Sequence, residues 1–329
     1  MGSSSEAGIL YYGKLENMNI AVFDIGTNSI HMLIAEIRPD LSFKILGHEK
    51  DTTRLGDGSF ERRRLRKKSM SRAWNVIEHF YEAAKKYHVS RMIGVATSAV
   101  RDAKNGKAFI REVYRRTGMH VRIVSGDEEG RLIELAARSN MPVQGKKTLV
   151  VDIGGGSMEL IVGDGKKHYF LKSFPLGVAR LTDHFLRKDP PSAKQLRKLE
   201  KYVEKKLLRA VKKIKKLTVA NVIGTAGTLI NLGSMVYESE SSKHLKLVHH
   251  YVLERKSLEK IHDRIIRLPL KQRLNFPGLD ARRADIILAG SVLVRSLMRL
   301  LRIDRITISK LGIREGLLLD YIAKNGNRS

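Results

Sequence analysis

The chain contains no cysteine among its 329 residues. Disulfide bonds, thiol chemistry and thiolate metal sites are therefore excluded, which fits a cytoplasmic setting. Long apolar runs are also missing, since stretches such as 286–294 are far shorter than the roughly 20 residues of a membrane-spanning helix. The first residues, Met1 to Ser5, lack the basic and apolar regions of a secretory signal. We expect no membrane segment.

Acidic residues are scarce relative to basic ones. The chain has 34 Asp and Glu against 62 Lys and Arg, which gives a formal net charge of +28 at pH 7. An excess of this size predicts a polyanionic partner: nucleic acid, an anionic membrane surface or inorganic polyphosphate. Charge alone does not choose among these. Apolar residues still make up 42% of the chain, and its length is sufficient for two domains with buried cores.

Several catalytic signatures are missing as well. No glycine-rich loop ends in Gly-Lys-Ser or Gly-Lys-Thr, and the histidines have no metal-ligand spacing. Nothing in the order of residues indicates a Ser-His-Asp triad.

Two glycine-containing turns provide the strongest positive signal. Each follows a short apolar run typical of a buried strand, and they read Asp24-Ile25-Gly26-Thr27-Asn28-Ser29 and Asp152-Ile153-Gly154-Gly155-Gly156-Ser157. Glycine lets the backbone approach a ligand closely, so such a turn can direct N–H groups and a hydroxyl at a phosphate oxygen. One copy alone is only moderately specific, because Asp-Ile-Gly also occurs as ordinary turn chemistry where a strand leaves a sheet. Two copies predict a two-lobed enzyme that holds a phosphate chain from both sides of a cleft.

The elements around the two turns repeat in the same order. The first part predicts strands at 19–24, 30–37 and 42–50, a helix at 59–87, a strand at 91–97, a helix at 99–117 capped by Gly118, a strand at 120–124 and a helix through Arg138. After a linker at 142–147, strands are predicted near 148–152, 157–163 and 166–174. This repetition predicts an α/β fold with an internal duplication. Residues 1–18 are predicted to be a disordered tail, with Met18 as a candidate natural start.

A helix predicted from Ser192 to Lys216 is strongly basic. Its apolar residues recur every three or four positions and form one buried stripe, while Lys and Arg cover its other faces. Each lysine alone is typical of a solvated surface, whereas the whole set equally suits a polyanion track. The cluster from Arg62 to Lys68 has the same two interpretations.

Carboxylates next to these turns are candidates for chemistry. In Ser125-Gly126-Asp127-Glu128-Glu129, helix capping explains Ser125 and Glu128 but leaves Glu129, which could either complement the helix dipole or deprotonate a water. Asp152 and Glu159 flank the second turn on adjoining strands, so they can converge on one hard cation such as Mg²⁺. Gly227 and Thr228, in a third turn, can supply donors to a phosphate or simply pack. Arg101, which follows Thr97 and Ser98, suits bidentate contact with a phosphoryl group.

Taken together, these motifs resemble the exopolyphosphatase and guanosine pentaphosphate phosphohydrolase family, within the superfamily of actin, sugar kinases and heat-shock chaperones. The likeness runs from about Asn19 to Asp320. It rests on the two turns continued to His31 and Glu159, and on the segments 97–103, 125–129, 224–228, 282–290 and 312–316.

The resemblance implies two ribonuclease-H-like lobes around a deep cleft, as in actin-like ATPases. Residues 19–138 with about 305–329 would form the first lobe, and 139–304 the second. It also implies Mg²⁺- or Mn²⁺-dependent release of the terminal phosphate from a chain, with Glu129 as general base and Asp152 and Glu159 as metal- and water-positioning residues. Phosphate contacts would come from Arg101 and from Asp24, Thr27, Asn28, Ser29, Gly154, Gly155, Gly156, Ser157, Gly227 and Thr228.

The sequence therefore favours an exopolyphosphatase acting on inorganic polyphosphate, because the +28 charge suits a long polyanion better than a nucleotide. Guanosine pentaphosphate is the alternative substrate. A non-catalytic polyanion- or nucleic-acid-binding protein and an ATP-using kinase are more distant alternatives, and a homodimer is left open.

Two substitutions depart from the family pattern: Gly130 stands in place of the usual alanine and Met158 in place of the usual threonine. Neither removes a functional group. The chain stops after the two predicted lobes, whereas longer members continue into a helical domain, so long-chain processivity does not follow from the resemblance.

Overall fold

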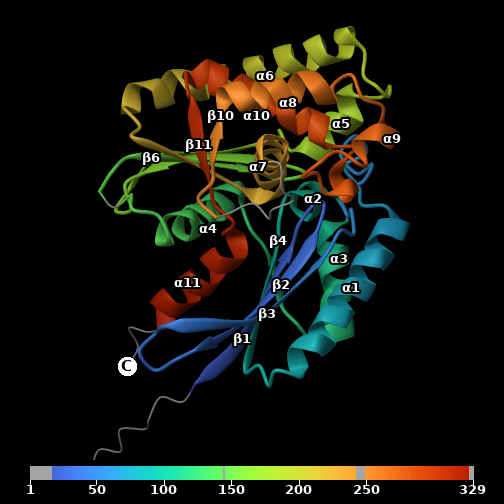
Figure 1. The fold of residues 1–329 in the computed structure, drawn as a ribbon. Coiled ribbons are helices and arrows are strands. Elements are labelled where there is room, and N and C mark those ends of the chain that lie inside the picture. The colour runs from blue at the N-terminus through green and yellow to red at the C-terminus, as the bar shows by residue number, and fades with distance from the viewer. Residues whose placement is uncertain (1–16, 144, 242–248, 326–329) are drawn as a thin grey trace, which may run out of the picture.

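The computed structural model describes residues 17–143, 145–241 and 249–325, which form two lobes (Figure 1). The predicted tail lies almost wholly outside the described residues, although Met18 already belongs to the first strand. Within the described ranges, no helix has both the length and the apolar character required to cross a membrane.

The first lobe is built on a mixed sheet with the strand order β3-β2-β1-β4-β5. Strands β1 to β3 pair antiparallel, and β1, β4 and β5 run parallel. The inner strands are almost continuously apolar because helices cover both faces of the sheet. The strands are β1 (Met18–Ile25), β2 (Ile30–Ile37), β3 (Phe43–Asp51), β4 (Arg91–Ala96) and β5 (Val121–Ile123).

The second lobe repeats this arrangement in a sheet with the order β10-β11-β9-β6-β7-β8. Strand β11 takes the place that β5 has in the first sheet, and β10 adds one strand at the edge. The repeated order is that of the ribonuclease-H-like unit, so the predicted duplication and fold class are confirmed. The strands are β6 (Thr148–Ile153), β7 (Met158–Gly163), β8 (His168–Phe174), β9 (Asn221–Thr225), β10 (Val252–Glu254) and β11 (Arg305–Ile308).

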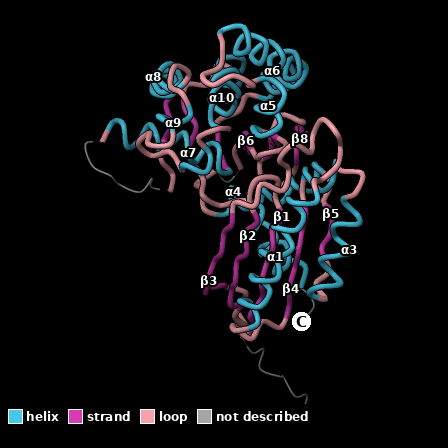
Figure 2. Tube along the Cα trace, turned by 90° about the vertical axis from the view of Figure 1, so that its right-hand side faces the viewer, coloured by secondary structure: helices cyan, strands magenta, loops and turns pink. Residues whose placement is uncertain are grey.

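Helices cover the outer faces of both sheets (Figures 1 and 2). On the first lobe these are α1 (Lys67–Lys85), α2 (Ser98–Asp102) and α3 (Gly106–Thr117). On the second they are α5 (Val178–Phe185), α6 (Ala193–Ile214), α7 (Ala226–Glu240), α8 (Arg255–Ile265), α9 (Leu270–Arg273) and α10 (Ile287–Leu301), with 3₁₀ turns η1 (Lys215–Leu217) and η2 (Ala281–Arg283). The predicted basic helix is α6, which begins with a capping box formed by Ser192 and Gln195.

Two helices between the sheets join the lobes, because each follows a strand of one sheet and packs on the other sheet. Helix α4 (Gly126–Ser139) follows β5 of the first sheet but packs on β6, β7 and β8, whereas α11 (Ile313–Asn325) follows β11 of the second sheet but packs on β1 and β2. The helices also contact each other, and a Cβ at Gly316 would lie only 2.0 Å from the carbonyl oxygen of Leu132. Strand β11 pairs with β9 of the second sheet, and α11 is the C-terminal segment that packs on the first sheet.

Two helix predictions in the first lobe were wrong in their bounds. The helix predicted at 59–87 begins only at Lys67, because Gly58 and Arg63 adopt positive φ (59° and 50°) and Ser59 Oγ donates to Gly56 O at 2.8 Å. The helix predicted at 99–117 is two helices, and Ala103 between them is extended. It ends, as predicted, at Gly118, which caps α3 with a φ of 70°.

Candidate active site

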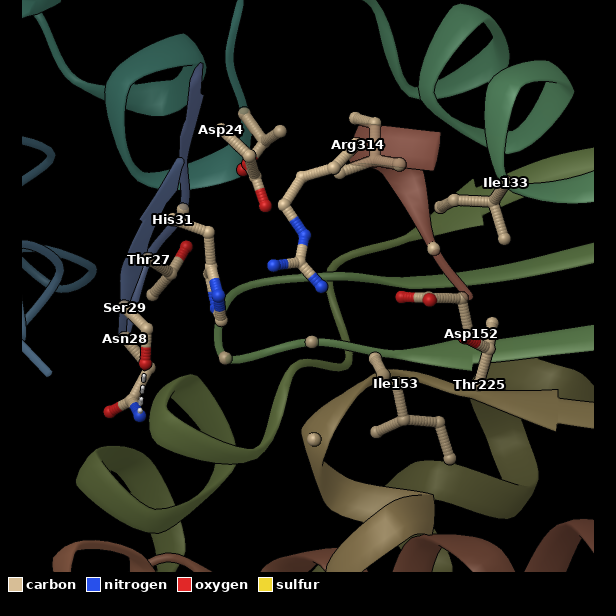
Figure 3. A pocket seen from close by; sticks show the side chains of 18 of the residues that line it. Asp24, Thr27, Asn28, Ser29, His31, Ile133, Asp152, Ile153, Thr225 and Arg314 are labelled. Atoms are coloured by element: carbon tan, nitrogen blue, oxygen red, sulfur yellow. Dashed lines mark hydrogen bonds between the residues drawn. The ribbon is translucent and has the colours of Figure 1, made fainter. Parts of the chain in front are cut away.

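A cavity of about 370 Å³ lies between the lobes and is lined by both predicted phosphate turns (Figure 3). Most of the residues predicted for the site line it: Asp24, Thr27, Asn28, Ser29, Glu129, Asp152, Gly154, Gly155, Gly156, Ser157 and Gly227. Three do not, namely Arg101, Glu159 and Thr228. The cavity therefore brings together segments from both halves of the chain, as a cleft between duplicated lobes requires.

The two turns have the same backbone geometry and touch each other. Gly26 N donates to Ser29 O at 3.1 Å, and Gly154 N donates to Ser157 O at 3.0 Å. A Cβ at Gly156 would lie 2.4 Å from Ser98 Oγ and 2.6 Å from Thr27 Oγ1. Glycine at position 156 is thus required by the close approach of the opposite lobe, which explains why the second turn is richer in glycine than the first.

Asp152 and Glu159 lie opposite each other in the β6–β7 register, as the hairpin pattern predicts. Directly paired residues project on the same face of a sheet, so both carboxylates point to the cleft side. The Glu159 side chain is deeply buried behind the lining, where its Oε1 accepts from Ser173 Oγ at 2.6 Å and its Oε2 has no hydrogen-bond partner among the described residues. Asp152 is the member of the pair that reaches the cavity.

Glu129 lies in the first turn of α4 and lines the cavity. Arg101 Nη1 donates to its Oε2 at 2.7 Å and to Val124 O at 3.1 Å, so the guanidinium predicted to contact phosphate instead holds this carboxylate. Ser125 caps the helix by accepting from Glu128 N at 3.1 Å. The Glu128 side chain does not complete the capping box, because it pairs with Arg122 at 2.7 Å.

Four carboxylates crowd the inner end of the cleft. Burial raises the pKa of Glu129, and the nearby Arg101 opposes that rise. Burial also raises the pKa of Asp152 and of Glu159 well above their usual values, and Glu129 adds to both effects. The pKa of Asp24 rises to about 7, again through burial first, although Arg314 opposes the change. This end of the cleft therefore attracts a proton or a cation.

The residues present fit a divalent cation that shares its coordination with substrate. Asp24 Oδ1 and Glu159 Oε2 are buried oxygens to which no residue in the described ranges donates a hydrogen bond. In the described part of the chain, no group of three or more His, Asp or Glu residues could hold a metal ion by itself. Mg²⁺ is commonly held by one or two carboxylates together with waters and phosphate oxygens, which matches such an incomplete protein ligand set.

A group of cations lines the rest of the cavity and was missed by the sequence reasoning: Lys50, Arg283, Lys310 and Arg314. His31 lies among them, and its pKa falls to about 2, mainly through burial and then through Arg314, Lys50 and Arg283. In Figure 3 the Arg314 guanidinium lies in view between His31 and Asp152. Arg283 and Arg314 belong to motifs quoted above, but no local pattern marks Lys50 or Lys310.

Arg283 is the most deeply buried of these four cations. The residue is only 8% exposed, and within the described ranges its guanidinium makes no hydrogen bond or ion pair. It lies over Gly227, where a Cβ would come within 2.1 Å of Nη2. Burial lowers the pKa of Arg283, although Asp280 opposes this effect. A buried cation that makes no hydrogen bond is expensive, so Arg283 is a candidate for binding an anion.

Comparison with known proteins decides the family. The Ppx/GppA phosphatase family matches residues 33–325. The chain belongs to this family. It is 27% identical over 303 residues to exopolyphosphatase 1 of Mycobacterium bovis, covering 92% of this chain and 88% of that protein. It is similar to the crystal structure of an exopolyphosphatase from Cytophaga hutchinsonii, with a TM-score of 0.87, 27% identity and coverage of 93% and 98% of the two chains.

A second kind of relative is equally similar in sequence. The guanosine-5'-triphosphate,3'-diphosphate pyrophosphatase of Vibrio vulnificus is 26% identical over 304 residues, which cover 92% of this chain and 59% of that longer protein. Membership of the Ppx/GppA family thus makes the chain a phosphatase of that family without separating the two activities.

In this Ppx/GppA family member the duplicated halves of the site are chemically unequal. The strand register places His31 opposite Asp24 in the first lobe, where the second lobe has Glu159 opposite Asp152. The place of Glu129 in α4 corresponds to Gly316 in α11, since Ser125 O and Gly312 O accept from those residues' N–H groups at 2.9 and 3.0 Å. Three of the four carboxylates, Glu129, Asp152 and Glu159, therefore lie toward the second-lobe turn. In the first-lobe turn the single carboxylate Asp24 is paired with His31, on which Arg314, Lys50 and Arg283 act.

Proposed function

We propose that the protein is an exopolyphosphatase that hydrolyses the terminal phosphoanhydride of inorganic polyphosphate and releases orthophosphate. The observation that carries this proposal is the division of the cleft into a carboxylate end and a cationic end. A phosphate chain needs a site for attack on its last phosphorus and separate cations for the phosphates that follow. The family members compared above include proteins named as exopolyphosphatases, which supports the same assignment.

The proposed reaction is an in-line attack by water. Glu129 takes a proton from the water, whose oxygen bonds to the terminal phosphorus while the bond to the bridging oxygen breaks. Arg101 holds the Glu129 carboxylate in place at 2.7 Å and favours its ionised form. Asp152 and Glu159 would hold Mg²⁺ or Mn²⁺, which supplies charge neutralisation at the phosphoryl oxygens. The N–H groups of the turn at 154–157 would bind the same phosphate.

The proposed orientation follows from the same charge pattern. The terminal phosphate would occupy the second-lobe turn next to Glu129 and Asp152, and the remaining chain would pass the first-lobe turn. Neutral His31 offers a hydrogen bond there without adding negative charge, unlike its counterpart Glu159. Lys50, Arg283 and Arg314 surround that path.

Hydrolysis of guanosine pentaphosphate is the second candidate, because one relative carries that kind of activity in its name and the same machinery would serve. We favour polyphosphate because the net charge of +28 far exceeds what one nucleotide needs. Phosphate release from polyphosphate, guanosine pentaphosphate and ATP should be measured side by side. A clear preference for the nucleotide in kcat/KM would overturn the polyphosphate assignment, and turnover of ATP alone would favour a nucleotide enzyme of another kind.

The basic helix α6 provides a test of long-chain binding. It lies on the outer side of the second lobe (Figure 1). Its exposed residues include Lys205, Lys206, Lys212 and Lys213. If these lysines hold a long chain, replacing all four by Glu should raise the KM for long polyphosphate by about tenfold or more, because counterion release drives such binding. The KM for tripolyphosphate and the kcat for both substrates should change little.

A control with the same change of charge uses the exposed Lys86, Lys107, Lys256 and Lys260. Equal effects of the two quadruple variants, or equal effects on short and long substrates, would mean that α6 is only a solvated surface.

A further inference from the structure

The carbonyl groups of the three glycines in the second phosphate turn accept hydrogen bonds from the start of α5. Gly154 O accepts from Val178 N at 3.0 Å, and Gly155 O accepts from Ala179 N at 2.9 Å and from Arg180 N at 3.2 Å. Gly156 O accepts from the side chain, Arg180 Nε, at 2.9 Å. In a trans peptide the N–H points opposite to the C=O, so these bonds direct the following N–H groups to the cavity side.

Backbone N–H groups of the segment after β3 hold the carbonyl groups of the first phosphate turn in a similar way. Thr27 O accepts from Gly56 N at 2.9 Å, and Asn28 O accepts from Arg54 N at 2.9 Å. Arg54 itself has a φ of 51°, a left-handed conformation that is unusual for a side chain of this size. In both lobes, therefore, an arginine belongs to the segment that orients the turn.

Each of these arginines also crosses the cleft to an aspartate of the other lobe. Arg54 makes a bidentate pair with Asp285, at 2.7 and 2.9 Å, and donates to Arg282 O at 2.8 Å. Arg180 makes a short contact with Asp102 at the end of α2. Its guanidinium also lies 4.1 Å from the ring centroid of Phe60, a first-lobe residue.

We infer that Arg54 and Arg180 are positioning residues that form two reciprocal latches between the lobes. The orientation of each phosphate turn is thereby coupled to contact with the opposite lobe, so the two turns are complete as anion sites only when the cleft is closed. The identity of the substrate in this inference rests on the proposed function, whereas the closure of the lobes is inferred from the cross-lobe contacts alone.

The partners of the latches lie next to residues of the site. Asp285 is two positions after Arg283, whose buried guanidinium lies over Gly227, and Arg54 also donates to the carbonyl of Arg282, the residue directly before Arg283. Asp102 adjoins Arg101, which holds Glu129. Closing the latches therefore also places the anion-binding Arg283 and the base Glu129. Both ion pairs are partly buried, so each should stabilise the closed cleft more than a fully exposed pair would. The side-chain exposures are 38% for Arg54 and 32% for Asp285, and 21% for Arg180 and 38% for Asp102.

Kinetics of single variants test the latches. Asp285→Ala removes only the cross-lobe partner, so the KM for tripolyphosphate should rise by roughly five- to tenfold while kcat stays within about twofold. Arg180→Met also frees the Gly156 carbonyl, so it should raise KM and lower kcat by about tenfold or more.

Arg187 and Glu61 form a matched control, because they pair across the lobes at 2.8 Å but hold neither turn. Arg187→Gln should leave both constants within about twofold.

Lobe closure can be measured separately from activity. Because the chain has no native cysteine, Lys86→Cys directly after α1 and Lys212→Cys on α6 allow one spin label per lobe at exposed positions. In pulsed electron resonance without ligand, Asp285→Ala and Arg180→Met should broaden and lengthen the distance distribution, and Arg187→Gln should not. Tripolyphosphate should narrow the distributions again. Failure of the parent protein to hydrolyse polyphosphate would contradict the proposed function but leave this distance test intact.

The inference is overturned if the latch variants and Arg187→Gln give the same distance distributions and the same KM as the parent. Unfolding of an arginine variant is separated from loss of the latch by Asp285→Ala, which leaves every bond to the turns in place.

Discussion

Replacement of Glu129 by glutamine is expected to lower the kcat for phosphate release by about 10²–10⁴-fold, the usual cost of losing a general base. The amide keeps the shape of the side chain and one oxygen that can still accept from Arg101, now 2.7 Å from Oε2. Substrate affinity should therefore stay within about threefold. Single-turnover rates and binding of polyphosphate to the inactive variant would measure the two effects separately.

The neighbouring Glu128 provides a matched control. Its carboxylate pairs with Arg122 at 2.7 Å, away from the cavity lining, so Glu128→Gln should retain nearly full activity. Because burial raises the pKa of Glu129, the parent rate should fall on acidification at a higher pH than an exposed glutamate would allow. Retention of more than half of the parent activity by Glu129→Gln would remove this residue from the role of base.

Removal of either proposed metal-holding residue is expected to have a comparable effect. Asp152→Ala or Glu159→Ala should reduce activity by about 10³-fold or more, since charge stabilisation of the transferred phosphoryl group by a cation contributes several kcal/mol. We expect a cation to bind here because the two carboxylates, together with Glu129, repel one another unless a cation or protons are present. Activity in excess chelator, its recovery with Mg²⁺ or Mn²⁺, and direct titration of Mn²⁺ would check the proposal.

Stability measurements separate this loss from unfolding. Removing one crowded, buried carboxylate relieves repulsion, so the melting temperature without metal should not fall, whereas the stabilisation that the parent gains from added Mg²⁺ should disappear. Full activity of the parent in excess chelator would contradict the metal requirement.

Local patterns predicted the parts of this fold that depend on near neighbours. The pairing of Asp152 with Glu159 follows from a short turn between two apolar runs, and Gly118 ends α3 because a left-handed cap suits glycine. The wrong helix bounds occur where distant segments bond instead. Lys104 N donates to Arg63 O at 2.8 Å, and Asn105 Oδ1 accepts from Leu65 N at 2.9 Å. These contacts hold both segments out of the helices that their residue patterns favour.

The sequence by itself determined the duplication, the two glycine turns and the identity of the candidate catalytic carboxylates, because each is encoded in contiguous residues. Only the tertiary structure decided that Arg101 faces Glu129, that Glu159 lies behind the cavity, and that Lys50, Arg283, Lys310 and Arg314 meet around His31. The pair of Arg54 and Asp285 is separated by 231 positions. Such contacts depend on how two lobes pack, and no short-range periodicity of side chains specifies that packing.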